Sequence, residues 1–208
     1  CSVGMGQTNL VVNPSFEDFT LCPDNWAQIE RIDNWEAYKG SPDYFNSCEP
    51  TNSFSTPQNL MGNQTPASGN SYGGLIFYSR DGINADEIMG VQLSQPLSIG
   101  IKYYISFRVV LKYNSPFGVC CANNKIGAKF STQSYTTSNP PTIDNNAHIW
   151  TDSVISDTLN WNQIFGSFTA DSTYNYLMIG YFFTNPNITI NDIIPANDFG
   201  YYYVDDVC

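Results

Sequence analysis

The chain has 208 residues with 8 Lys or Arg against 19 Asp or Glu, which gives a formal net charge of −11. Eight scattered cations form no basic stripe, and this excludes nucleic acid and anionic lipid as partners, because both require Lys and Arg to replace counterions. Hydrophobic residues make up 42% of the chain, enough to bury a core and to exclude disorder. We therefore expect one globular domain, and the lack of 18 consecutive apolar residues predicts no membrane-spanning helix.

Short strands joined by turns dominate the predicted secondary structure. Gly, Pro, Asn, Ser and Thr recur every few residues, whereas helical periodicity is nearly absent. The first strand is expected at 9–12, and long ordered loops are expected over 21–66, which is rich in Pro and Asn and shows little alternation. Further strands are predicted at 72–78, 87–93, 103–111, 125–132, 151–155, 162–170, 174–183 and 200–207. Together they predict an all-β fold, a two-sheet antiparallel β-sandwich of jelly-roll type with long ordered loops.

The clearest alternation of apolar and polar residues lies between Tyr103 and Leu111. Because side chains of a strand point alternately to its two faces, this segment has one apolar face and one wetter face. The apolar face comprises Tyr103, Ile105, Phe107, Val109 and Leu111, and the wetter face comprises Tyr104, Ser106, Arg108 and Lys112, with Val110 among them.

Six cysteines in an acidic, Tyr-rich and Asn-rich chain indicate an oxidising, extracytoplasmic compartment. We favour a disulfide between Cys22 and Cys48, which would close the loop-rich segment. The adjacent Cys120 and Cys121 either reach different partners or form a vicinal bridge. No Cys-x-x-Cys motif occurs and His148 is the single histidine, so no zinc site is expected.

The first seven residues form a segment of their own in this interpretation. Residues 1–7 resemble the small-residue end of a secretory signal, or a tether in which Cys1 carries lipid. The single β-sandwich domain is expected to span 8–208.

Both ends of the chain resemble galactose-binding-like jelly-roll modules, the fold of many carbohydrate-binding modules. The resemblance rests on the opening Asn9-Leu-Val-Val-Asn-Pro-Ser-Phe-Glu17, a following Trp, and the closing Tyr201-Tyr-Tyr-Val-Asp-Asp-Val207. It implies a structural calcium where the first and last strands meet. The matching ligands would be Glu17 with Asp205 or Asp206, since calcium takes six to eight hard oxygen ligands.

The middle of the chain resembles the N-terminal domain of surface proteins from Bacteroidota. The motifs are Cys22-Pro23, Gly40 to Cys48, Pro66 to Gly74 and Ile126 to Ser131, and the resemblance runs from about Leu10 to Val207. In that group the domain often precedes an OmpA-type domain or a gliding-associated sorting domain for type IX secretion. The sequence departs from this pattern where it stops at Cys208, before any sorting domain, and where Cys120-Cys121 replaces a polar turn.

A glycan site requires aromatic faces for the apolar faces of sugars and planar polar groups for their hydroxyls. The wetter face of the 103–111 strand supplies Tyr104 and Arg108. Neighbouring strands and loops are expected to add Tyr78, Gln92, Tyr181, Asp43, Tyr44 and Asn46.

Catalysis is not expected. Glu30, Asp33, Glu36 and Asp43 lie close in sequence, but nothing distinguishes them from ordinary loop acids. A Ser-His-Asp triad would have only His148, and no Gly-x-Ser-x-Gly elbow is present.

Two hypotheses of function follow. The first is a non-catalytic secreted or cell-surface module that binds glycan and holds a structural calcium. The alternative is a purely structural envelope, filament or gliding and type IX secretion-associated surface protein that binds other proteins and no small ligand. Both place the protein outside the cytoplasm, secreted or at the outer membrane.

Overall fold

The computed structural model describes residues 8–80, 85–112, 119, 121–193 and 199–208. The interpretations given for residues 1–7, Cys1 and Cys120 lie outside this part of the chain. Apart from strands, the described residues contain two short 3-10 turns, η1 (Ile29–Arg31) and η3 (Asn185–Asn187). A search of the same residues finds no helix with the length and apolar character to cross a membrane.

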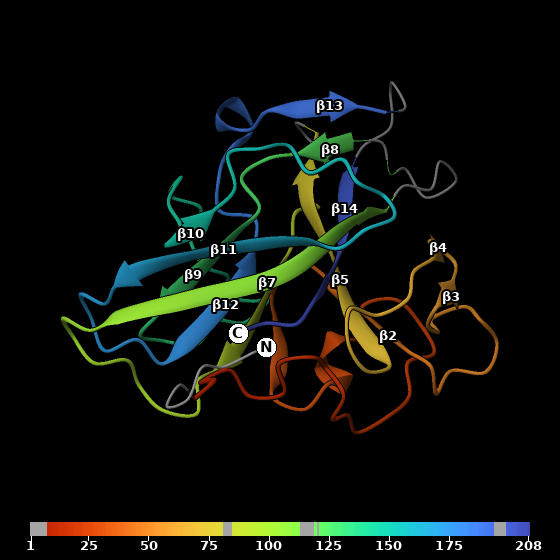
Figure 1. The fold of residues 1–208 in the computed structure, drawn as a ribbon, viewed down its shortest axis with the longest axis horizontal. Helices are drawn as coiled ribbons and strands as arrows, with labels where there is room; N and C mark the ends of the chain where they lie inside the picture. Colours follow the sequence, from red (N-terminus) through yellow and green to blue (C-terminus); the bar gives the residue numbers. More distant parts are fainter. Residues whose placement is uncertain (1–7, 81–84, 113–118, 120, 194–198) are drawn as a thin grey trace.

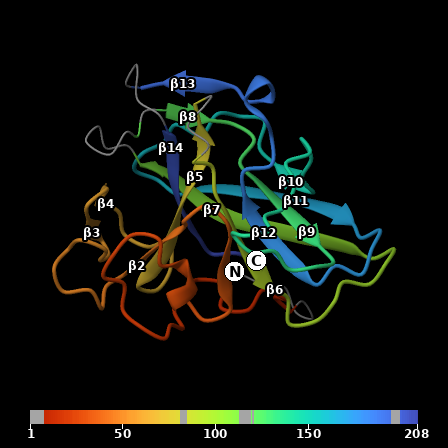
Figure 2. The ribbon, with the colours of Figure 1, turned by 180° about the vertical axis from the view of Figure 1, so that it is seen from behind.

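Two five-stranded antiparallel sheets form the molecule, one in front of the other in Figure 1 and exchanged in Figure 2. The front sheet has the order β11 (Asn162–Thr169), β7 (Lys102–Lys112), β14 (Phe199–Asp205), β5 (Ser71–Ser79) and β2 (Asp43–Asn46). The back sheet has the order β1 (Trp35–Lys39), β6 (Ile88–Gln92), β12 (Tyr176–Gly180), β9 (Gly127–Ser131) and β10 (Ile149–Trp150). Two small pairs complete the list, β3 (Gln58–Asn59) with β4 (Gly62–Asn63) and β8 (Cys121–Asn123) with β13 (Ile190–Asp192). The predicted two-sheet antiparallel jelly-roll sandwich is confirmed.

The main core lies between the sheets and confirms the alternation predicted for β7. Ile105, Phe107 and Val109 are at most 3% exposed and point inward, whereas Tyr104 and Arg108 point outward and are exposed. Trp35 of the back sheet closes the core against Phe16, with ring centroids 4.9 Å apart. Each such aromatic or aliphatic side chain stabilises the folded state by roughly 1.5–3 kcal/mol when it is fully buried.

Three of the predicted element assignments are wrong. The segment 9–12 makes only an isolated bridge between Val11 and Leu93. The segment 21–66 contains β1 to β4; β2 is buried along its whole length, so its sequence carries no alternation to detect. Residues 151–155 form no strand, and the short strand of this region is β10.

Candidate functional site

The outer face of the front sheet divides into a covered half and an open half. The covered half carries Phe45, Tyr72 and Tyr203 from three neighbouring strands. Their rings contact one another, with centroids 4.3 Å apart for Tyr72 and Tyr203 and 5.1 Å apart for Phe45 and Tyr203. Phe54 from the loop after β2 and Trp26 pack over them, so this half is a second apolar core.

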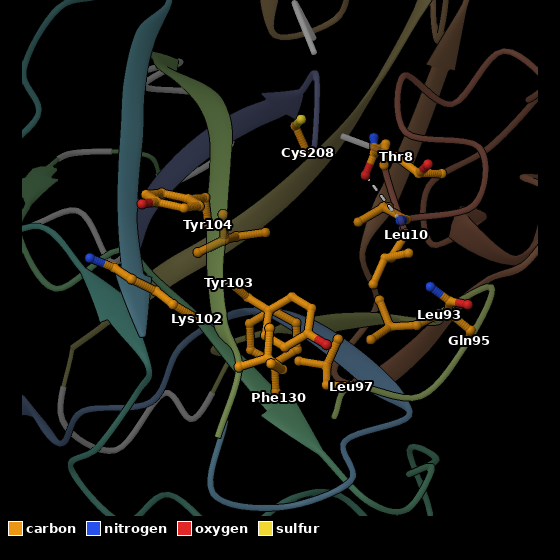
Figure 3. Close-up of a pocket in the computed structure, with 14 residues that line it drawn as sticks. Thr8, Leu10, Leu93, Gln95, Leu97, Lys102, Tyr103, Tyr104, Phe130 and Cys208 are labelled. Carbon is orange, nitrogen blue, oxygen red and sulfur yellow. Dashed lines mark hydrogen bonds between the residues drawn. The ribbon is translucent and has the colours of Figure 1, made fainter. Parts of the chain in front are cut away.

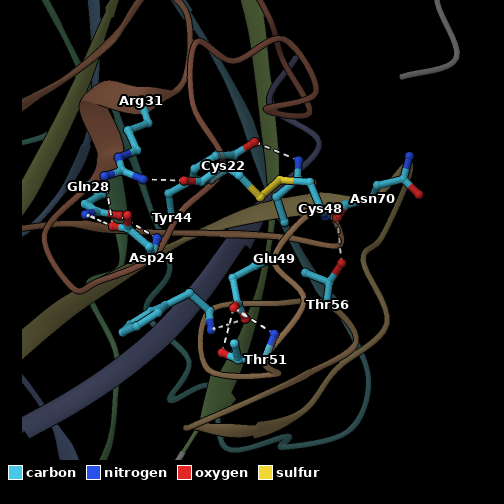
Figure 4. The surroundings of a disulfide bond; sticks show 12 residues. Cys22, Asp24, Gln28, Arg31, Tyr44, Cys48, Glu49, Thr51, Thr56 and Asn70 are labelled. Carbon is cyan, nitrogen blue, oxygen red and sulfur yellow. Dashed lines mark hydrogen bonds and ion pairs between the residues drawn. A yellow bond between two sulfur atoms is a disulfide. The ribbon is translucent and has the colours of Figure 1, made fainter.

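The loops over the covered half are fastened at several points (Figure 4). The predicted disulfide joins Cys22 to Cys48, across 26 residues of sequence. The Glu49 carboxylate accepts hydrogen bonds from the backbone N–H groups of Thr51, Ser53 and Phe54 at 2.8–3.1 Å. These contacts hold the loop against the sheet.

Lys112 is a buried lysine that contacts both the covered half and the loops beside it. The Lys112 ammonium donates to the Gln64 side chain at 2.7 Å and to the carbonyl of Thr158 at 2.8 Å, and it lies 5.8 Å from the centre of the Tyr203 ring. Burial lowers the pKa of Lys112 to about 8, because a charged amine loses hydration there. These contacts tie the loops that carry Gln64 and Thr158 to the covered half beside Tyr203.

The open half presents two exposed aromatic side chains on neighbouring strands. Tyr104 of β7 is 66% exposed and Phe165 of β11 is 74% exposed. The register pairs Phe165 with Ser106 and Gln163 with Arg108, so all these side chains share one face. We call Tyr104, Ser106, Arg108, Gln163 and Phe165 the open platform. It combines aromatic faces with planar hydrogen-bonding groups, the chemistry suited to a neutral, hydroxyl-rich ligand.

A cavity of about 470 Å³ adjoins the open platform, with Thr8 and Cys208 in its lining (Figure 3). Figure 3 shows Tyr104 and Lys102 along one side of it, and Leu10 along the other. Apolar side chains, including Tyr103 and Phe130, form much of its wall. Tyr104 therefore belongs both to the platform and to the rim of this cavity.

The other residues predicted for glycan binding lie elsewhere. Asp43, Tyr44 and Asn46 belong to β2 and are at most 6% exposed. The Tyr44 hydroxyl donates to the carbonyl of Phe16 at 3.3 Å. The Asp43 carboxylate accepts from Ala27 N–H and the Tyr201 hydroxyl, both at 2.7 Å.

Tyr78 and Tyr181 are 6% and 9% exposed, and Gln92 is exposed on the back sheet. The structure therefore brings only Tyr104 and Arg108 of the predicted set together. It adds Phe165 and Gln163, which were not among the predicted site residues. The alternation within β11 was available, but only its register with β7 shows that Phe165 shares a face with Tyr104.

Two carboxyl groups, Asp43 of β2 and Glu87 just before β6, are buried and have raised pKa values. Burial raises the pKa of Asp43 to about 6. Burial, and then the nearby Asp43, raise the pKa of Glu87 to about 8. The Glu87 carboxylate accepts hydrogen bonds from Ser41 N–H at 3.0 Å and Ile76 N–H at 2.8 Å. These contacts fix the chain around β2, β5 and β6, and Glu87 is only 3% exposed.

Three of the four acids considered for catalysis lie together, but Asp43 and His148 lie apart from them. Glu30, Asp33 and Glu36 line a second cavity of about 510 Å³, whereas Asp43 is buried within the front sheet. His148 packs against aromatic rings, and its Nδ1 accepts a hydrogen bond from Phe130 N–H at 3.1 Å. Burial lowers its pKa, as expected for a histidine held in an aromatic cluster.

The carboxylates predicted to bind calcium surround one loop, residues 67–71. Glu17 accepts from Asn70 N–H at 2.8 Å and from the Ser71 hydroxyl at 2.6 Å. Asp205, fully buried, accepts from the N–H groups of Ala67 and Ser68 at 2.8 and 3.2 Å.

Asp206 contacts the same loop, because its Oδ1 accepts a hydrogen bond from the Ser68 hydroxyl, and its Oδ2 pairs with Arg108 Nε at 3.2 Å. A cation shared by Glu17 and Asp205 would therefore have to replace the N–H and O–H groups that now donate hydrogen bonds to the two carboxylates. No group of three His, Cys, Asp or Glu able to hold a metal occurs among the described residues.

Comparison with known proteins yields likeness of fold alone. No family model matches the chain, and no curated protein matches it. Among solved structures, the chain is similar to the CBM22-1–GH10 modules of Clostridium thermocellum xylanase 10B complexed with xylohexaose, at 13% identity and a TM-score of 0.48. The match covers 97% of this chain and 28% of the xylanase chain.

Two similar structures match over nearly their whole length. The K1 cleaved adhesin domain of Lys-gingipain from Porphyromonas gingivalis W83 has 13% identity and a TM-score of 0.44, with 97% of this chain and 96% of that chain covered. TmCBM61 in complex with β-1,4-galactotriose has 12% identity and a TM-score of 0.42, with 97% of each chain covered. Likenesses at this level describe architecture and leave the ligand of this chain to be inferred from its own residues.

Proposed function

We propose that the protein is a non-catalytic glycan-binding module and that the open platform is its binding surface. The observation that carries the proposal is the pair of solvent-exposed rings on neighbouring strands, Tyr104 and Phe165, with Arg108 and Gln163 beside them. Rings of this kind cover the apolar face of a sugar, while the guanidinium and amide groups meet its hydroxyls. The alternative, a structural surface protein without a small ligand, predicts no carbohydrate binding at all.

Replacing Tyr104 by alanine is expected to weaken polysaccharide binding about tenfold, because an aromatic contact is worth about 1.4 kcal/mol. Affinity electrophoresis against the best polysaccharide from a glycan array measures this loss. Ile99→Ala is the matched control, since Ile99 is 64% exposed but lies outside the open platform. Absence of binding to every polysaccharide, or equal binding by both variants, would contradict the assignment.

The cellular location belongs to the same proposal: the protein is secreted or held at the outer-membrane surface. The Cys22–Cys48 disulfide supports this location, because such bonds persist in oxidising compartments. An origin in Bacteroidota and an association with OmpA-type or type IX sorting domains stay a prediction from the sequence resemblance. Fractionation of the native host would test the location directly.

A structural calcium at Glu17 and Asp205 is a further part of the proposal. Its support is that both carboxylates contact the single loop 67–71, so one ion there would tie the two chain ends together. Added calcium is then expected to raise the melting temperature of EDTA-treated protein, and Glu17→Gln is expected to lose this rise. Identical melting curves with calcium and with EDTA would exclude a structural role for the ion.

A further inference from the structure

Strand β11 is an open edge of the front sheet. Among the residues that the structure describes it pairs with β7 alone, and Figure 1 shows it at the rim of the sheet. No backbone hydrogen bond joins 163–169 to any other segment of the described chain. The strand is eight residues long and contains no charged residue and no proline. Long, uncharged edges are templates for pairing with another strand, which natural proteins ordinarily block.

The other three ends of the two sheets are blocked in recognisable ways. At β2, loop segments hydrogen-bond along the edge, through Ile29 N–H to Pro42 and through Asn46 N–H to Phe54. Strand β1 carries Glu36 and Lys39, and β10 is only two residues long. Loops, charge and short length are the usual devices against edge pairing. Among these four ends, β11 alone has none of them.

We propose that β11 is the interface for a second copy of this chain, paired antiparallel about a two-fold axis. Backbone donors and acceptors of an edge strand are self-complementary under such an axis. Charge does not oppose contact at this strand, because β11 carries no charged residue. Two copies with a net charge of −11 repel each other, and β11 offers a neutral surface on which they can meet.

The exposed face fixes the register. Gln163, Phe165, Ser167 and Thr169 point to the open side, and residues opposite each other in a continuous sheet must share a face. The central register that satisfies this places Phe165, the most exposed apolar side chain of β11, beside Phe165 of the partner subunit. Gln163 then lies opposite Ser167 of the partner subunit. Cross-strand aromatic pairs of this kind stabilise a sheet.

This arrangement has a consequence for recognition that rests on the proposed function. A two-fold axis perpendicular to the sheet keeps both open platforms on the same face of one continuous sheet. When the two open platforms of one dimer bind the same polysaccharide, the overall affinity exceeds that of either platform alone. The dimer itself requires no glycan, so its test is independent of carbohydrate binding.

Sedimentation equilibrium of the purified full chain without carbohydrate tests the proposal. A single strand pair is a small interface, so the dissociation constant of the dimer is expected to be micromolar. The wild type should therefore approach twice the monomer mass as its concentration rises above the micromolar range. Gln163→Lys with Ser167→Lys places like charges opposite each other and is expected to weaken association at least about tenfold. Gln163→Lys with Ser167→Glu creates two attractive cross-strand pairs in the same register and is expected to restore the dimer.

The control carries two lysines at exposed apolar positions outside β11. Leu159→Lys with Ile99→Lys alters side chains that are 76% and 64% exposed and is expected to leave the dimer intact. Circular dichroism checks that each variant is folded. A wild type that stays monomeric, a dimer that survives both lysines in β11, or a Lys/Glu variant that does not reassociate would overturn the proposal.

Discussion

Replacing Asp205 by alanine is expected to lower the free energy of unfolding by about 3 kcal/mol, since each buried N–H left without a partner costs about 1–3 kcal/mol. The Asp205 side chain is fully buried and accepts hydrogen bonds from the backbone N–H groups of Ala67, Ser68 and Asp206. Alanine removes the two carboxylate oxygens that accept these three hydrogen bonds. Urea denaturation near pH 5 measures the loss.

The size of this loss should depend on pH. Burial raises the pKa of Asp205 to about 8 from its ordinary value of 3.8, so the folded state favours the protonated side chain. The stability that this raised pKa supplies is complete below pH 3.8 and is lost as pH rises toward 8. The difference between wild type and Asp205→Ala is therefore expected to shrink between pH 5 and pH 8.

Asp157→Ala is the matched control for Asp205→Ala. Asp157 also accepts two backbone hydrogen bonds, from Leu159 and Asn160, but at an exposed turn where water replaces the lost acceptor. It is expected to cost much less and to show none of the pH dependence described for Asp205. Equal losses in the two variants would mean that burial of Asp205 contributes nothing.

Removing the Cys22–Cys48 disulfide through the double change Cys22→Ser with Cys48→Ser is expected to destabilise the protein by about 3 kcal/mol. The bond spans 26 residues, and opening it restores that freedom to the unfolded chain. Cys48 itself is exposed, so little apolar burial is lost with the sulfur atoms. Thermal unfolding should show a fall in melting temperature of about 6–12 °C for a chain of this size.

Hydrogen exchange locates the effect of the missing disulfide. The loops held by the bond carry Trp26 and Phe54 onto the covered half of the front sheet, so protection should fall first in these loops. Strand β12 in the back sheet serves as the internal control and should keep its protection. Unchanged exchange in the loops, together with an unchanged melting temperature, would show that the bond is not a structural fastening.

The sequence signal was clearest for β7, which has one solvent-exposed face, although β5 and β14 were also predicted and are buried along nearly their whole length. In β7 the alternation from Tyr103 to Leu111 was visible, because one side of the strand meets the core and the other meets solvent. Strand β2 is also buried on both sides but has only four residues, too few to stand out from the surrounding loop sequence. The nearby Pro and Asn residues, correctly taken as signs of loops, belong to the loops that cover its outer side.

The candidate site shows the same limit. Tyr104 and Arg108 could be chosen from their strand, since two-residue spacing places them on its wetter face. Phe165 could not, because a single strand does not reveal which neighbour it meets or in which register. Asp43, Tyr44 and Asn46 were predicted to be loop residues that bind a ligand. In the structure they are buried in strand β2 of the front sheet.

Composition and local spacing thus determined the class of fold, the Cys22–Cys48 pair as the favoured staple, and one face of one strand. These features depend on residues near each other in sequence, where periodicity and turn chemistry act directly. Tertiary structure decided which aromatic faces stay open, which carboxylates are buried, and which sheet edge is left unpaired. Each of these depends on the register between strands that are distant in sequence and on which surfaces the loops cover. Both are set by burial of side chains, which happens only when the whole chain has folded.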